Sequence, residues 1–218
     1  MANKKSYYKH PQFGHVYGEE ILVPEVRCCW PSLVKPKDPP PPKPGMPEGS
    51  PRYELTFLLP DTKEANKFIA DIEKMTKEML ALYNEDKKAT LGTITTYSDG
   101  NKFDLEKYPY YEGHKILVAR NQKMPIIVDA KRQAGSADII TGGCFVQALI
   151  TPLITAHGVS YKLNAVQFRR DDGTKFGGSA RDLTSMFSSV ESSDGAAPFE
   201  ADEPTEPVSA KKKAVNIL

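Results

Sequence analysis

PRYELTFLLPDTKEANKFIADIEKM, residues 51–75, contains two hydrophobic periods, and the change between them at Pro60 decides the fold class. Before the proline, apolar and polar residues alternate from Tyr53 to Leu59, which predicts a half-buried strand over residues 51–60. After it, Asp61 or Thr62 can cap a helix that runs to residue 84. The apolar residues of this helix recur every three or four positions and form one stripe to lie on a core: Phe68, Ile69, Ile72, Met75, Met79 and Leu82.

Five further segments are rich in aliphatic, β-branched or aromatic residues and predict strands: residues 21–36, 114–121, 125–130, 144–156 and 159–170. The last two are expected to form a hairpin across His157 and Gly158. Pro24 and Pro31 interrupt the first segment, which favours a place at the edge of a sheet. Because most consecutive strands have no helix between them, the sheet should be mostly antiparallel, and the fold mainly β with one long helix.

One folded domain is expected over residues 21–187, flanked by two segments of different composition. Residues 1–20 lack a clear hydrophobic period and predict an N-terminal arm, while residues 188–218 contain few apolar residues and predict a disordered, largely acidic tail. Within the domain, residues 35–51 hold about eight prolines, too many for a helix or a strand ladder. This proline-rich loop is either a stiff spacer between two strands or a ligand for a partner domain.

The charges are distributed unevenly, although the net charge of the 218 residues is only +1. Residues 191–207 are acidic and contain no basic side chain, so the part before them is positive by roughly four. Three cysteines, two of them adjacent, cannot build a disulfide framework and indicate a reducing compartment, which predicts a cytoplasmic protein. The sequence shows neither a signal peptide nor an apolar run long enough to span a membrane.

The sequence contains no motif that would support catalysis, so we expect a binding protein rather than an enzyme, with no cofactor and no metal. Its histidines lie far apart without a HxxxH spacing, no CxxC occurs, and no phosphate-binding GxxxxGK[ST] loop is present. Asp171 and Asp172 could be paired acidic ligands, but two aspartates before Gly173 are more typical of a hairpin turn. A metal-dependent nuclease is an alternative that this spacing does not favour.

The segment VSYKLNAVQFRR, residues 159–170, indicates what is bound. Strict alternation places Tyr161, Leu163, Ala165, Gln167 and Arg169 on one face, and Lys162, Asn164, Val166, Phe168 and Arg170 on the other. One face can be core, while the other combines cations and an amide with an aromatic ring. Aromatic residues between separated cations fit an extended nucleic-acid chain, because rings stack on unpaired bases and cations follow the phosphates. The alternative is a core phenylalanine followed by a solvated strand end.

The order of these segments resembles one protein family. YELTFLLP followed at once by DTKEANKFIADIEKM, and then GHKILVARN, PIIVD, GGCFVQALI and LNAVQFRRDDGTKFGG, is similar to the bacteriophage-encoded OB-fold single-stranded DNA-binding proteins. The resemblance covers residues 18–186. It implies a five-stranded barrel with a helix between strands. It also implies binding of single-stranded DNA without sequence preference, in phage replication, recombination or repair in the cytoplasm of the infected bacterium.

In OB-folds the middle strands and their loops form the binding face. The candidate DNA-binding residues of this chain combine such a position with suitable chemistry. The cations among them are Lys115, Arg120, Lys123, Lys131, Arg132, Lys162, Arg169, Arg170 and Lys175. The rings that could stack on bases are Tyr110, Tyr111, Phe145, Tyr161 and Phe168.

Two features depart from the family pattern. The proline-rich insertion is longer than the resemblance leads us to expect, and the chain ends SAKKKAVNIL where related phage proteins often carry an acidic tail with a terminal aromatic. The acidic stretch before this end can occupy a cationic groove or bind phage replication or recombination proteins. A second copy could pair at an exposed barrel edge. The rival function is a protein-interaction or virion-structural module that uses the proline-rich loop and the tail.

Overall fold

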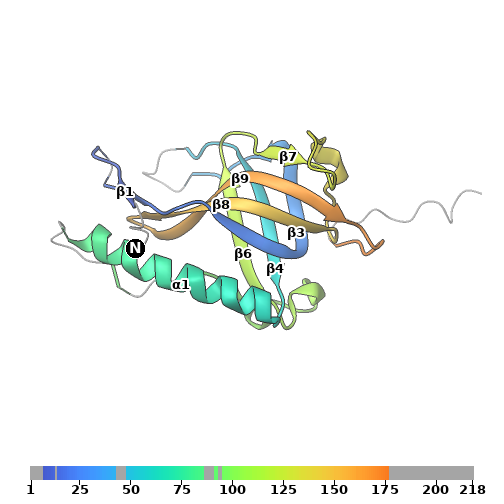
Figure 1. Cartoon of the computed structure of the whole chain (residues 1–218), viewed down its shortest axis with the longest axis horizontal. Coiled ribbons are helices and arrows are strands. Elements are labelled where there is room, and N and C mark those ends of the chain that lie inside the picture. Colours follow the sequence, from blue (N-terminus) through green and yellow to red (C-terminus); the bar gives the residue numbers. More distant parts are fainter. Residues whose placement is uncertain (1–6, 13, 43–47, 86–90, 93–94, 177–218) are drawn as a thin grey trace, which may run out of the picture. The chain divides into compact units, whose positions relative to one another are not determined.

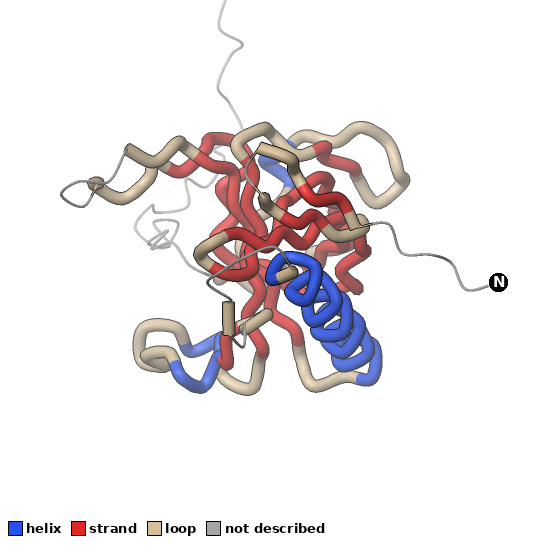
Figure 2. Tube along the Cα trace, turned by 90° about the vertical axis from the view of Figure 1, so that its left-hand side faces the viewer, coloured by secondary structure: helices blue, strands red, loops and turns tan. Residues whose placement is uncertain are grey.

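A computed structural model of the chain describes residues 7–12, 14–42, 48–85, 91–92 and 95–176. The tail predicted over residues 188–218 lies outside them, as do parts of the N-terminal arm and of the proline-rich loop. The described residues form one unit, in which a long helix lies beside a strongly curved sheet (Figures 1 and 2). No helix in these ranges is long and apolar enough to cross a membrane.

Five strands close into a barrel in the order β3 (Ile21–Lys37), β4 (Arg52–Leu59), β6 (Lys115–Asn121), β9 (Gly158–Arg170) and β8 (Phe145–Thr155). Each strand pairs with the next, and β8 pairs back to β3. All these pairs are antiparallel except that of β6 with β9. This closed order with one long helix between strands is the barrel expected of an OB-fold, so the predicted fold is confirmed (Figure 1).

Shorter elements extend the barrel. β7 (Ile126–Val128) pairs in parallel with β9, and β5 (Ser98–Asp99) pairs with β6. Three short 3-10 helices are described: η1 (Gly100–Lys102), η2 (Pro109–Tyr111) and η3 (Ala137–Ile139). Within the predicted N-terminal arm, β1 (Tyr8–Lys9) pairs with β2 (Val16–Tyr17), and β2 pairs with β8. The described part of the arm is therefore attached to the sheet.

β3 is not the edge strand that its prolines suggested, because it pairs with β4 on one side and β8 on the other. Its register shifts in three intervals: Val23–Val26, Cys29–Ser32 and Ser32–Lys37. Each interval contains one proline: Pro24, Pro31 and Pro36. A proline has no N–H to donate, so it is tolerated where the ladder is already irregular. The prolines therefore mark bulges in a barrel strand rather than a free edge.

Helix α1 (Lys63–Asn84) begins where the capping pattern predicted. Thr62 is its N-cap, and the Thr62 hydroxyl accepts a hydrogen bond from the N–H of Ala65 at 3.3 Å. The predicted apolar stripe is buried as far as Met79, whereas Leu82 is only half-buried and Tyr83 is buried beside it. The stripe packs on β2, β3 and β8, so the helix covers one wall of the barrel (Figure 2).

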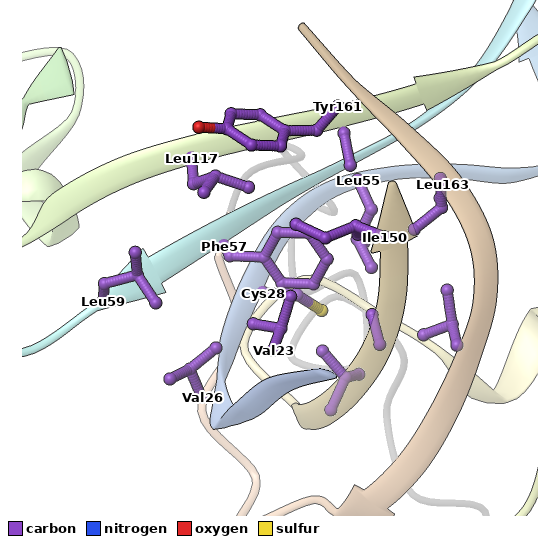
Figure 3. Packing of buried hydrophobic residues seen from close by; sticks show 14 of the residues in the cluster. Val23, Val26, Cys28, Leu55, Phe57, Leu59, Leu117, Ile150, Tyr161 and Leu163 are labelled. Carbon is purple, nitrogen blue, oxygen red and sulfur yellow. The ribbon is translucent and has the colours of Figure 1, made fainter. Parts of the chain in front are cut away.

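The barrel interior is filled by side chains from all five strands. Phe57 of β4 lies among Leu117, Ile150 and Leu163, all of them almost fully buried (Figure 3).

Cys28 also points inward, with its Sγ 3.7 Å from that of Cys144. The three cysteines are free and buried. The hydrogen bond with Cys144 and burial raise the pKa of the Cys28 thiol, and burial raises the pKa of Cys29 to about 12.

Candidate nucleic-acid interface

A one-residue bulge in β9 changes which of its side chains face outward. The ladder to β8 skips Asn164, which leaves it as an extra residue. Beyond the bulge Val166 and Phe168 face the core, on the same side as Tyr161. The strict alternation predicted for residues 159–170 is therefore wrong in its second half, because one inserted residue shifts a period of two to the opposite face.

A second bulge brings Arg169 and Arg170 to the same side of the sheet. The ladder pairs Phe145 with Arg170 and skips Arg169. Instead of pointing to opposite faces, both guanidinium groups reach Glu25 of β3. The Nε atoms of Arg169 and Arg170 lie 3.2 Å and 2.9 Å from the two carboxylate oxygens of Glu25. The end of β9 thus presents two adjacent cations on the outer surface.

Phe145 lies between two arginines in a row that crosses three strands. Arg27 of β3 pairs in register with Phe145 of β8, which pairs with Arg170 of β9. The guanidinium carbon lies 4.3 Å from the ring centre for Arg27 and 3.4 Å for Arg170. Arg27 also donates to the carbonyl of Gly143 at 2.8 Å and to both carboxylate oxygens of Asp172. The attraction between guanidinium groups and the ring holds this row together.

The glycine pair Gly142–Gly143 lets the segment after β9 cross the sheet at close range. A Cβ on Gly142 would lie 2.1 Å from the carbonyl oxygen of Phe176, and one on Gly143 would lie 2.0 Å from that of Thr174. Gly143 also has a φ of 107°, which favours glycine. The crossing places the Phe176 ring beside Arg27, with the guanidinium carbon 5.8 Å from the ring centre.

Phe176 leads into a group of aromatic rings on the outside of the barrel. The Phe176 ring stacks on Tyr110 at 4.7 Å, and the Trp30 ring lies 6.2 Å from Tyr110 and 6.1 Å from Tyr108. Trp30 has a φ of 52° and keeps 38% of its surface exposed. Together with the preceding row these rings make a continuous band, the arginine-aromatic strip: Arg170, Phe145, Arg27, Phe176, Tyr110, Trp30 and Tyr108.

The aromatic half of the strip rests on a small core of its own. Tyr111 lies beneath it, packed with Cys29, Leu58 and Ile116 on the outer side of β3, β4 and β6. Burial raises the pKa of Tyr110 to about 12, so its phenol is neutral at physiological pH. The hydroxyl of Tyr110 is buried and has no hydrogen-bond partner in the described part of the chain. The rings are thereby fixed from below while Trp30 faces solvent.

Carboxylates neutralise the arginines of the strip. Partial burial disfavours the charged form of Glu25, but hydrogen bonds from Arg170 and Arg169 outweigh this and lower the pKa of Glu25. The hydrogen bond from Arg27 holds the pKa of Asp172 well below its usual range. Both carboxylates are therefore ionised at neutral pH. They orient the guanidinium groups at positions where a phosphate oxygen would be a chemically similar partner.

Arg120 and Lys162 form a second cationic group on the outer surface. They are neighbours in register across β6 and β9. Arg120 forms an ion pair with Glu54 of β4, whose other carboxylate oxygen lies 3.5 Å from Lys37 of β3. Lys162 and Arg170 are eight positions apart in β9, which is roughly 26 Å along a strand. The predicted cations Arg120 and Lys162 therefore lie apart from Arg169 and Arg170 on the barrel.

Lys123, Lys131 and Arg132 lie exposed in turns near β7. Lys123 follows β6, and its N–H donates to the side-chain oxygen of Asn121 at 3.1 Å. Lys131 and Arg132 belong to a turn organised by the carboxylate of Asp129. These cations are accessible to an anionic ligand but lie outside the strip.

Lys175 lies next to the strip in the sequence, whereas Lys115 lies in a separate cleft. Lys175 precedes Phe176 of the strip and pairs with Asp171 at 2.8 Å, which raises the pKa of Lys175 and lowers that of Asp171. Lys115 lies 5.3 Å from the Tyr97 ring centre, in a cleft of about 1120 Å³ between α1 and residues 95–103. Lys175 therefore adds charge beside the strip, whereas Lys115 does not contribute to it.

Two of the predicted stacking rings are buried, and a third is partly buried against the core. Tyr161 is buried in the barrel, and its hydroxyl donates to the carbonyl of Thr96 at 2.9 Å. Tyr111 is buried beneath the strip, and Phe168 packs against the core because of the Asn164 bulge. Of the predicted rings, Tyr110 and Phe145 belong to the strip.

The aspartates after β9 accept backbone hydrogen bonds, as expected for a turn. Asp171 accepts from the N–H of Gly173 at 2.9 Å, and Asp172 accepts from that of Thr174 at 3.2 Å. Across the described ranges, no group of three or more His, Cys, Asp or Glu side chains is arranged to hold a metal ion.

Residues 19–197 match the family model described as "Enterobacter phage Enc34, ssDNA-binding protein". The chain belongs to this family. The solved single-stranded DNA-binding protein from bacteriophage Enc34 shares 26% identity with it at a TM-score of 0.51, over 85% of this chain and 96% of that one. The Enc34 protein in complex with ssDNA shares 27% identity at a TM-score of 0.54, over 81% and 100% of the two chains. No curated protein sequence matches the chain.

In this member of the Enc34 family, several strip residues were not among the predicted ones: Arg27, Trp30, Tyr108 and Phe176. Arg27 and Trp30 lie in the segment 21–36, for which the apolar composition predicted only a strand. Their rarity could have marked them as candidates, since Arg27 is the only cation between Ile21 and Val34 and Trp30 is the only tryptophan of the sequence. The contact between Phe176 and Tyr110 joins segments 66 residues apart, which no local pattern indicates.

Proposed function

We propose that the chain binds single-stranded DNA without reading its sequence, and that it coats and protects unwound DNA during phage replication, recombination or repair in the cytoplasm of the infected bacterium. The arginine-aromatic strip is the observation that supports this function most directly. Membership of the Enc34 family adds support, and so does the similarity to an Enc34 protein that was solved in complex with ssDNA. No catalytic step is part of the proposal.

The strip offers both kinds of contact that an unpaired strand needs. Its guanidinium groups can bind phosphates, and its rings, above all the exposed Trp30, can stack on bases. Bases in a duplex are already stacked on one another, so the rings favour a single strand. Because every base has a π-face, stacking tolerates any sequence. These contacts fit a protein that covers any single strand that becomes exposed.

The direct test is a fluorescence-anisotropy titration of a labelled oligo-dT of about 30 nucleotides, longer than the roughly 4–16 nucleotides that one OB-fold covers. Binding should be tight at low salt and should weaken steeply as salt rises, because bound phosphates release counterions. A duplex of equal length should compete poorly. Absence of binding at low salt would refute the proposal and direct attention to the proline-rich loop as a site for a protein partner.

The arginines at the end of β9 are tested by the double variant Arg169→Ala with Arg170→Ala. Affinity should fall for all base sequences alike. The slope of log K against log salt should decrease by about 1.4, since each lost phosphate contact on a single strand accounts for about 0.7. Lys67→Ala with Lys74→Ala is the matched control, because it removes two exposed cations from α1. An unchanged slope in the arginine variant would show that these side chains are only a solvated strand end.

The acidic tail belongs to the same proposal. Residues 191–207 lie outside the described residues, and we propose that they contact phage replication or recombination proteins, or occupy the cationic surface when DNA is absent. Deleting residues 188–218 and repeating the titration separates the two roles. Competition with DNA predicts a gain in affinity, while partner recruitment alone predicts no change.

A further inference from the structure

A shallow apolar groove lies on the outer face of the sheet beside the strip. Leu22 of β3, Leu149 of β8, Ala165 of β9 and Ile126 of β7 are neighbours in register across four strands. Leu22 and Ile126 are 54% and 69% exposed. A hollow of about 190 Å³ lies over Leu22, Leu149 and Ala165. Leu149 and Ala165 between them are half-buried, so the described part of the chain leaves the row only partly covered.

Amide groups border the groove on the side of the strip. Gln147 and Gln167 are neighbours in register and lie between the aliphatic row and Phe145. The side chain of Gln167 is engaged, since it donates to the carbonyl of Asp129 at 3.0 Å and accepts from Arg169 at 3.4 Å. The Gln147 amide, although half-buried, has no hydrogen-bond partner in the ranges that the structure describes. Gln147 therefore has donors and an acceptor available for a ligand.

Arg132 lines the groove from a turn of fixed shape. Its φ is 66°, and its N–H donates to the carbonyl of Asp129 at 3.2 Å. The carboxylate of Asp129 accepts the N–H groups of Lys131 and Gln133, each at 2.8 Å. An apolar floor with a few polar groups at the rim is the usual composition of a ligand site.

We propose that this groove holds one unpaired base of the DNA strand whose phosphates lie on the strip, and that Gln147 contacts the edge of that base. The inference rests on the proposed function. Leu149 lies four residues from Phe145 along β8, roughly 13 Å, so neighbouring nucleotides of one strand can reach both places. A paired base cannot enter, because its faces are stacked and its edge is occupied. The groove therefore adds selectivity for single strands.

A second copy of the chain is a poorer occupant of this groove. The aliphatic row consists of a few side chains, whereas a stable interface buries roughly 1,200–2,000 Å². Single-stranded DNA matches the groove better, because its phosphates suit the cation at the rim and the apolar faces of its bases suit the aliphatic floor.

The variant Ala165→Trp tests the proposal by filling the groove. Its affinity should be measured for two ligands of equal length, oligo-dT and a fully abasic oligonucleotide that offers only the sugar-phosphate backbone. Loss of one base contact should weaken oligo-dT binding about tenfold, and binding of the abasic ligand should not change. Ser160→Trp is the matched control, because it adds the same ring to an exposed position of β9 outside the groove.

Leu22→Ser provides a second variant that removes part of the groove without adding bulk, and it should weaken oligo-dT binding in the same ligand-specific way. Unchanged oligo-dT affinity in both variants would overturn the proposal, and so would an equal loss for both ligands. A changed oligomeric state in light scattering, with oligo-dT affinity unchanged, would assign the groove to a second copy instead. Wild-type protein that fails to bind oligo-dT at low salt would refute the proposed function, and the base site with it.

Discussion

Replacing Glu25 with glutamine should tighten binding of single-stranded DNA about fivefold at low salt. Phosphates can bind Arg169 and Arg170 only if these guanidinium groups leave, or share, the Glu25 carboxylate. The two arginines are 34% and 54% exposed and Glu25 is 32% exposed, so solvent screens both ion pairs. Exposed pairs of this kind contribute about 0.2–1 kcal/mol each, so releasing both costs about 1 kcal/mol, or a factor of about five in affinity.

Oligo-dT anisotropy at about 50 mM and 200 mM salt measures the effect, which should shrink at the higher salt. Removal of any carboxylate makes the protein more cationic, so Asp71→Asn on α1 serves as the control for net charge alone. Weaker binding by Glu25→Gln would show that Glu25 holds the arginines in their DNA-binding geometry. Binding equal to that of the Asp71 variant would show that the arginines do not contact DNA. Either result refutes the reasoning.

The structure leads to four further predictions, on Trp30, on Gly143, on the buried cysteines and on Glu25. Emission from Trp30 should be quenched by oligo-dT but not by duplex, and Trp30→Ala should weaken oligo-dT binding about tenfold. Gly143→Ala should displace Phe176 and weaken DNA binding, while the far-UV circular dichroism spectrum stays unchanged. Gly113→Ala is the control, because Gly113 also has a positive φ but has open space around it, and this variant should bind DNA as the wild type does. Because their thiol pKa values are raised, Cys28 and Cys29 should resist alkylation at neutral pH until the protein is unfolded. Because the pKa of Glu25 is lowered, its contribution to the stability of the folded protein is complete above the ordinary pKa of 4.5 and is lost as pH falls below that value. Between pH 7 and pH 3 the urea midpoint of unfolding should therefore decrease less in Glu25→Gln than in the wild type.

The sequence was sufficient to predict the elements whose hydrophobic pattern has a long, unbroken period. The strand predicted at 51–60 is β4 at 52–59, and the helix begins at its Thr62 cap. The predicted hairpin between β8 and β9 is present, with its turn at Ala156 and His157, one position earlier than predicted. These features depend on local alternation, capping and turn chemistry. Closure of the barrel depends on β6 pairing in parallel with β9, a contact between segments about 40 residues apart that no local pattern encodes.

The site was predicted less completely, because alternation shows that a strand has two faces without showing which face is inside. Tyr161 and Phe168 were candidate stacking rings on that basis, but Tyr161 is buried and Phe168 is partly buried against the core. Phe145, Arg169 and Arg170 were candidates as well; in the structure both arginines pair with Glu25, and Arg170 lies over the Phe145 ring. Their role in binding DNA stays a prediction that the variants above can test.

The strip forms where the barrel departs from regular pairing. A regular ladder would send Arg169 and Arg170 to opposite faces, and the bulge places both on the outer one. The register shift that contains Pro31 accompanies the positive φ of Trp30, and the glycine pair allows the crossing that delivers Phe176. Each irregularity lowers the stability of the fold, because a bulge leaves ladder groups unpaired and a glycine loses more conformational entropy on folding than other residues. None of them adds much to the core. Three of them meeting at one surface are best explained by the surface they create, since proteins depart from local consistency mainly at functional sites.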